Sequence, residues 1–140
     1  MPDTKQEVID KLTKFRLVDK YQSFHEVMPY SFHADEAQRN TVTEVLDNCA
    51  KELLFLFKQA KKKPTKVNLK KVLQQHLTII SHLAVNESNK EFAYKLVWFL
   101  SEKVAVQLNK QSAKKYWGYW QVSDGEVQTV QYKKPRKKVQ

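Results

Sequence analysis

Apolar residues recur every three or four positions through most of the first 108 residues, and this period predicts α-helices. The first helix is expected over about residues 4–15, and a short second helix or a bend follows it. A long helix begins with acidic residues at 35–36 and ends in three lysines at 61–63, both of which suit the helix dipole. Pro64 then stops it. Its apolar stripe comprises Val42, Val45, Leu46, Cys49, Leu53, Leu56, Phe57 and Ala60.

Two further helices follow Pro64. The apolar stripe of the third comprises Leu69, Val72, Leu73, His76, Ile80 and Leu83, and Leu77 and Ile79 widen it. The fourth opens with Ser88 and Glu91, which are spaced as in a capping box, where each side chain binds an amide of the first turn. Residues 92–108 are apolar on nearly every side, as is typical of a central helix covered by its neighbours.

After Lys114 the period changes from 3.6 to 2, which predicts a β-hairpin over 116–132. Asp124-Gly125 is a strong two-residue turn signal, and the register would pair Val122 with Val127, Trp120 with Thr129 and Trp117 with Tyr132. The expected fold class is mainly α (α+β), a four- or five-helix bundle with a C-terminal two-stranded hairpin. An aromatic face of the hairpin is expected to lie on the bundle, since an isolated hairpin is barely stable.

The length of 140 residues predicts a single domain over 1–132, followed by a basic tail over 133–140 that we expect to be disordered. Only two glycines occur, which favours long helices over folds with many tight turns. Cys49 is the single cysteine, so the chain can form neither an internal disulfide nor a cysteine-based zinc site. The charged, periodic N-terminus and the lack of a long apolar run predict a cytoplasmic protein with no membrane contact.

The net charge of +10 is unevenly distributed. Residues 1–57 hold seven Lys/Arg against ten Asp/Glu, whereas residues 58–140 hold eighteen against five. Seven lysines, termed the junction lysines below, cluster where the second long helix gives way to the third: Lys58, Lys61, Lys62, Lys63, Lys66, Lys70 and Lys71. They can serve as phosphate contacts or simply as a solvated helix end. Lysine without arginine indicates a positioning patch that reads no base edges.

Two other C-terminal features can meet a partner. The tail carries the cations Lys133, Lys134, Arg136, Lys137 and Lys138, which fit a nucleic-acid arm, a short nuclear-import signal or a solubilising terminus. The hairpin carries the aromatic residues Trp117, Tyr119, Trp120 and Tyr132, which can stack on bases, form a protein contact, or anchor the hairpin to the bundle.

No catalytic or metal-binding pattern stands out. His76 and His82 lie about 240° apart on a helix and cannot share a ligand face. His25 and His33 have acidic neighbours, but they lack any recognised ligand spacing. The sequence therefore predicts no enzyme, no metal and no cofactor.

The expected function is a non-catalytic interaction module that binds an anionic macromolecule, nucleic acid or acidic protein, through the basic C-terminal half. The alternative is a small regulatory or structural protein-protein partner that uses the hairpin aromatics. A cryptic enzyme site is a third hypothesis, with the candidate residues His25, His33, Asp35 and Glu36. A helix followed by a hairpin also occurs in winged-helix DNA readers, but their recognition helix must be polar, and residues 92–108 are not.

Overall fold

The computed structural model describes residues 3–27, 35–108, 122–123 and 126–127, and within them the chain is mainly helical, as predicted. The α-helices are α1 (Lys5–Leu17), α2 (Lys20–Ser23), α3 (Glu36–Gln59), α4 (Lys66–Ser81) and α5 (Glu87–Lys103), with a short 3-10 helix η1 (His25–Val27) after α2. The expected helix over 4–15 corresponds to α1, and the phase change after it corresponds to α2 and η1.

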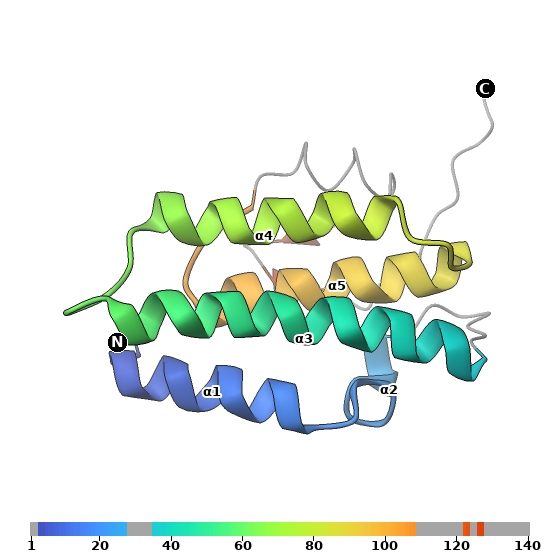
Figure 1. Cartoon of the computed structure of the whole chain (residues 1–140), viewed down its shortest axis with the longest axis horizontal. Coiled ribbons are helices and arrows are strands. Elements are labelled where there is room, and N and C mark those ends of the chain that lie inside the picture. The colour runs from blue at the N-terminus through green and yellow to red at the C-terminus, as the bar shows by residue number, and fades with distance from the viewer. Residues whose placement is uncertain (1–2, 28–34, 109–121, 124–125, 128–140) are drawn as a thin grey trace.

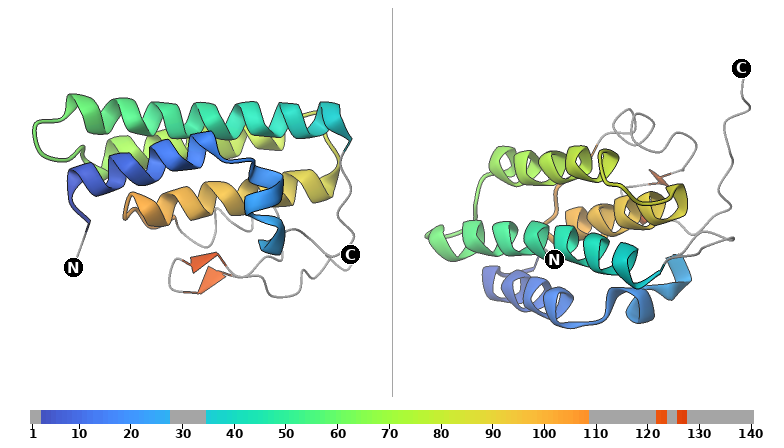
Figure 2. Two further views of the ribbon diagram at one scale, coloured as in Figure 1. Left: turned by 90° about the horizontal axis from the view of Figure 1, so that it is seen from below. Right: turned by 45° about the vertical axis from the view of Figure 1, so that its right-hand side comes forward.

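The four long helices lie side by side and alternate in direction (Figures 1 and 2). α3 packs against α1, α4 and α5, and α5 in turn packs against α1 and α4. This topology brings the start of α1, the end of α3, the start of α4 and the end of α5 to one end of the molecule, which we term the junction end (Figure 1, left).

α5 is the central helix, as its all-round apolar pattern predicted. Phe92, Leu96 and Trp98 are fully buried, and only Phe99 among its apolar residues is partly exposed. The helix ends at Lys103, however, five residues earlier than the expected 92–108 segment. Its burial extends even to Glu91 and Lys95, which form an ion pair of 3.0 Å within the helix.

The predicted capping box at the start of α5 is wrong. The helix begins at Glu87, and the cap is Asn86, whose side-chain oxygen accepts from the backbone N–H of Asn89 at 2.9 Å. Ser88 donates its hydroxyl to the same Asn86 oxygen at 2.8 Å. Glu91 does not turn back to the helix start but pairs with Lys95. The structure instead has a capping box at the start of α1, between Thr4 and Glu7.

Two smaller expectations also need correction. α3 ends at Gln59 with Ala60 as its C-cap, so the lysines at 61–63 follow the helix instead of forming its last turn. Ile79 was expected to widen the buried stripe of α4, but its side chain is 44% exposed. The buried face of α4 is formed by Leu69, Leu73, His76, Leu77 and Ile80, and Ile79 lies outside this arc.

Lys20 is a buried cation that the hydrophobic pattern did not reveal. Its ammonium donates to the carbonyls of Arg16 and Val18, each at 3.2 Å, and forms an ion pair with Asp47 of α3. It also lies 4.8 Å from the centre of the Phe15 ring. Lys20 thus satisfies carbonyls at the end of α1 and fastens that end to α3.

Two very short strands are described near the C-terminus, β1 (Val122–Ser123) and β2 (Glu126–Val127). They pair antiparallel with Val122 opposite Val127, and β2 packs against α5 (Figure 2, left). The remainder of the expected hairpin over 116–132 and the tail over 133–140 lie outside the described residues and stay predictions.

The chain leaves the C-terminus of α5 through a residue in the left-handed backbone conformation. Ala105 has φ of 59°, and the N–H groups of Ala105 and Val106 donate to the carbonyls of Glu102 and Ser101 at 3.1 and 2.9 Å. This is the Schellman arrangement, in which the left-handed position is usually glycine because a Cβ is disfavoured there.

We expect Ala105→Gly to stabilise the fold by about 0.5–1 kcal/mol, because losing the Cβ penalty outweighs the extra entropy of glycine in the unfolded chain. Ala37→Gly is the matched control, since Ala37 is also exposed but lies in the first turn of right-handed α3. It should destabilise, by up to about 1 kcal/mol. Chemical denaturation measures both; a loss of stability in Ala105→Gly would contradict the strained-cap account.

The buried ion pair of α5 makes a second prediction. Lys95→Met should cost about 3–5 kcal/mol at pH 7, since it leaves the Glu91 carboxylate buried without its cation, whereas Glu91→Met with Lys95→Met should cost far less. Burial raises the pKa of Glu91 above 4.5 despite the opposing effect of Lys95. In Lys95→Met, the Glu91 carboxylate therefore binds a proton more readily in the folded state than in the unfolded state. The loss in free energy of unfolding, relative to the unaltered protein, should shrink as the pH falls toward 4.5.

Denaturation curves of both variants at pH 7 and at pH 5 test this. A double variant as unstable as Lys95→Met, or a deficit that does not change with pH, would show that the ion pair is not the source of the loss.

Candidate anion-binding surface

All the junction lysines lie at the junction end of the bundle and form one region there. Lys58 is in the last turn of α3, the lysines at 61–63 are in the connection, and Lys66, Lys70 and Lys71 are in the first two turns of α4. Six of the seven side chains are exposed, and Lys70 is half-buried. Residues 58–71 contain no acidic residue, so no carboxylate in this segment offsets the charge.

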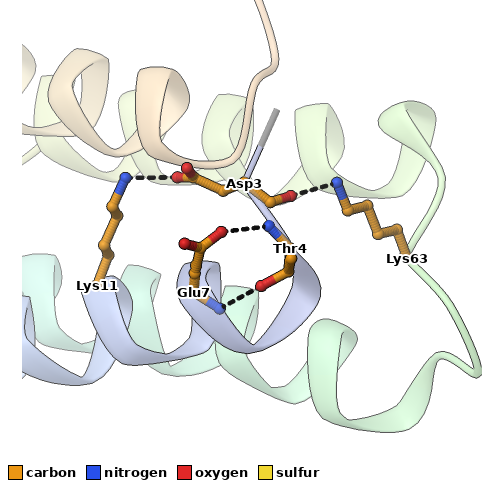
Figure 3. Close-up of polar contacts among 5 residues, drawn as sticks. All are labelled: Asp3, Thr4, Glu7, Lys11 and Lys63. Atoms are coloured by element: carbon orange, nitrogen blue, oxygen red, sulfur yellow. Dashed lines mark hydrogen bonds and ion pairs between the residues drawn. The ribbon is translucent and has the colours of Figure 1, made fainter. Parts of the chain in front are cut away.

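The N-terminal segment joins this region through space, a juxtaposition that the sequence did not reveal. Lys5 of α1 donates to the carbonyl of Ala60 at 2.6 Å, and Lys63 donates to the carbonyl of Asp3 at 2.6 Å. Figure 3 shows Lys63 reaching Asp3 from one side while Lys11 reaches its carboxylate from the other. Lys5 lies at the C-terminal end of α3, where a cation interacts favourably with the negative end of the helix dipole.

Asp3 is placed by the first turn of α1. The Thr4 hydroxyl accepts from the N–H of Glu7 at 3.1 Å, and the Glu7 carboxylate accepts from the N–H of Thr4 at 2.7 Å (Figure 3). This reciprocal pair fixes the direction in which the chain enters the helix. The signal was present in the sequence as Thr4 followed three residues later by Glu7.

The electrostatics of Asp3 show how many cations meet here. A hydrogen bond from Lys11 is the main cause that lowers the pKa of Asp3 below its ordinary value of 3.8. Desolvation opposes this shift, and the charges of Lys11, Lys103 and Lys63 add to it. Lys103 belongs to the last turn of α5, where its ammonium also lies 4.7 Å from the centre of the Phe99 ring. Cations from α1, the α3–α4 connection and α5 therefore surround one carboxylate.

The other junction lysines have no such engagement. Lys63 is held by Asp3, but no side chain of the remaining six makes a hydrogen bond or an ion pair with another residue in the described parts of the chain: Lys58, Lys61, Lys62, Lys66, Lys70 and Lys71. Their ammonium groups are available to an external anion.

The other predicted contact residues are not tested. The tail cations Lys133, Lys134, Arg136, Lys137 and Lys138, and the hairpin aromatics Trp117, Tyr119, Trp120 and Tyr132, lie outside the described residues.

Residues considered for catalysis or metal binding serve other roles where they are described. Asp35 caps α3 by accepting from the N–H of Gln38 at 2.8 Å, and the Nδ1 atom of His25 lies 3.1 Å from the carbonyl of Gln22. Cys49 is fully buried, and burial raises the pKa of its thiol well above the ordinary range. Within the described ranges no group of three potential metal ligands occurs, and no helix is long and apolar enough to cross a membrane.

The contact between Lys11 and Asp3 predicts a measurable titration. In Lys11→Met, the pKa of Asp3 should rise toward 3.8, because the carboxylate loses its hydrogen bond and its nearest cation. Lys14→Met is the control, since Lys14 is exposed on the same helix and makes no contact with Asp3. NMR titration of the carboxyl carbon measures the shift, and an equal rise in both variants would rule out the contact as its cause.

No protein-family model matches this chain, and no curated protein or solved structure is significantly similar to it. Functional inference therefore rests on its own residues and their arrangement.

Proposed function

We propose that this protein is a non-catalytic interaction module that binds an anionic macromolecule, nucleic acid or acidic protein, through the junction lysines. The observation that carries the proposal is that cations from three segments of the chain gather at one end of the bundle. Six of the junction lysines make no side-chain hydrogen bond or ion pair with another described residue. A cluster of exposed ammonium groups raises the local concentration of polyanions and speeds their association.

Electrostatics of this kind have a characteristic dependence on salt. Each lysine that neutralises a phosphate releases condensed counterions, so the logarithm of the association constant falls linearly with the logarithm of salt concentration. Four lysine contacts correspond to a slope of about −3 to −4. Residues 58–71 contain no arginine, and this favours contact with a charged backbone over recognition of base edges.

Charge reversal at the centre of the patch tests the proposal. Lys61→Glu with Lys62→Glu should weaken binding to a labelled oligonucleotide or to poly-glutamate by on the order of tenfold or more, and should make the salt dependence shallower. Both residues are exposed and lie outside the helices, so the fold should be retained. Fluorescence anisotropy between about 50 and 200 mM salt measures affinity and slope together.

The matched control is Lys14→Glu with Arg16→Glu, which changes the net charge equally at two exposed positions of α1. If both double variants lose the same affinity, net charge and not the junction patch governs binding. If the unaltered protein binds neither polyanion at low salt, the proposed function is wrong.

A further inference from the structure

Phe55 is an exposed aromatic side chain on the outer face of α3. Its side chain is 58% exposed, and the other large apolar residues exposed in the described part of the chain are aliphatic: Leu17, Val67 and Ile79. Its neighbours Leu53, Leu54 and Phe57 are buried in the core, so the backbone that carries the ring is held rigidly. An exposed phenyl ring forgoes the free energy that its burial would contribute, and nothing in the packing of α3 accounts for its exposure.

Two lysines flank this ring along the helix. Lys51 precedes Phe55 by four residues and Lys58 follows it by three, and side chains at these spacings are neighbours on one helix face. Both lysines are exposed, and neither is engaged by another residue among those described. They stand about 10 Å apart along the axis, one on each side of the ring.

Two acidic residues lie on this exposed side of α3: Glu52, three positions before Phe55, and Glu44, about three turns before it. The carboxylate of Glu52, the nearer of the two, lies 3.4 Å from the Nε2 atom of His76 on α4, so it is directed toward the neighbouring helix. Lys58 connects this face to Lys61 and Lys62 of the junction patch. The cationic surface therefore extends from the junction end along α3 to the ring.

On the basis of the proposed function, we infer that the anionic partner is a single-stranded nucleic acid, with Phe55 stacked on one base and Lys51, Lys58 and the junction lysines contacting its phosphates. Non-specific single-strand binders combine these two elements, a basic track and an exposed ring, because every base has a flat face and every linkage a charge. A duplex offers the phosphates but keeps its base faces stacked on one another, and an acidic protein offers carboxylates without regularly spaced rings.

A lipid surface fits the same residues less well. Interfacial helices insert a broad apolar face into the membrane, whereas Phe55 stands alone among polar residues on the exposed side of α3. Those residues are Glu44, Asn48, Lys51, Glu52, Lys58 and Gln59.

The test uses the full chain and four probes: a fluorescein-labelled 20-nucleotide oligo(dT), a duplex of the same length, poly-glutamate, and anionic phosphatidylserine vesicles. Phe55→Ala should bind oligo(dT) roughly 5- to 140-fold more weakly, the range that corresponds to the loss of one stacked base. The salt slope should not change, since no charge is removed. Phe55→Trp should bind at least as tightly as the unaltered protein, because it retains a stacking face.

Val67→Ala is the matched control. Val67 is an exposed apolar residue next to Lys66, its side chain is 72% exposed, and it has no ring to stack. The Val67→Ala variant should bind oligo(dT) with unchanged affinity, and this result would distinguish the loss of a stacking ring from a general loss of apolar surface. Lys51→Glu with Lys58→Glu should weaken binding and also reduce the salt slope.

The outcomes separate this inference from the proposed function. If Lys61→Glu with Lys62→Glu weakens binding but Phe55→Ala does not, the junction patch stands and the single-strand inference fails. It also fails if the duplex, poly-glutamate or the vesicles are bound more tightly than oligo(dT). If no probe binds at low salt, both proposals fail together.

Discussion

The burial of α5 on every side is the constraint on which the rest of this structure depends. A helix whose apolar residues point in all directions is stable in water only if other segments cover each face, because each exposed apolar side chain forgoes about 1.5–3 kcal/mol. α1, α3 and α4 supply most of this cover. Even Asn89, Glu91 and Lys95 are buried: Asn89 is hydrogen-bonded to Gln38, and Glu91 and Lys95 form an ion pair with each other.

Polar contacts fix how the covering helices are placed around α5. At the end opposite the junction, Asn89 accepts from the Tyr21 hydroxyl at 3.1 Å and donates to Gln38 of α3 at 2.9 Å. Lys20 fastens the end of α1 to Asp47. Apolar packing tolerates sliding, whereas buried polar groups lose free energy unless each one finds its partner, so these contacts set the register of the bundle.

The alternating direction of the helices then decides where charge collects. Because α1 and α4 start where α3 and α5 end, residues far apart in the chain meet at the junction end. Lysines that lack an acidic partner, unlike the buried Lys20 and Lys95, stay at the surface there. Lys11, Lys63 and Lys103 thus surround Asp3, while the unengaged junction lysines project into solvent. The basic surface is a consequence of topology as much as of composition.

The helical pattern by itself determined much of the fold. The 3.6-residue period located the four long helices, and the all-round apolar character of the segment near Trp98 identified the central one, because both depend only on which side chains avoid water. The run of lysines over 58–71 was likewise visible as a candidate site. Helix ends were less certain: Ser88 and Asn86 are both good caps, and Asn86 has the advantage that its N–H also binds Gln38 of α3 at 2.9 Å.

Only the tertiary structure decided which residues meet. A periodic pattern specifies the buried face of a helix but not the neighbour that covers it, so the burial of Lys20 and the approach of Asp3 to Lys63 depended on how α1 packs against α3. For the same reason the sequence did not reveal Phe55 as a surface residue: a phenylalanine beside a buried stripe is exposed or covered according to whether another helix lies against it. Packing around α5 leaves that side of α3 open.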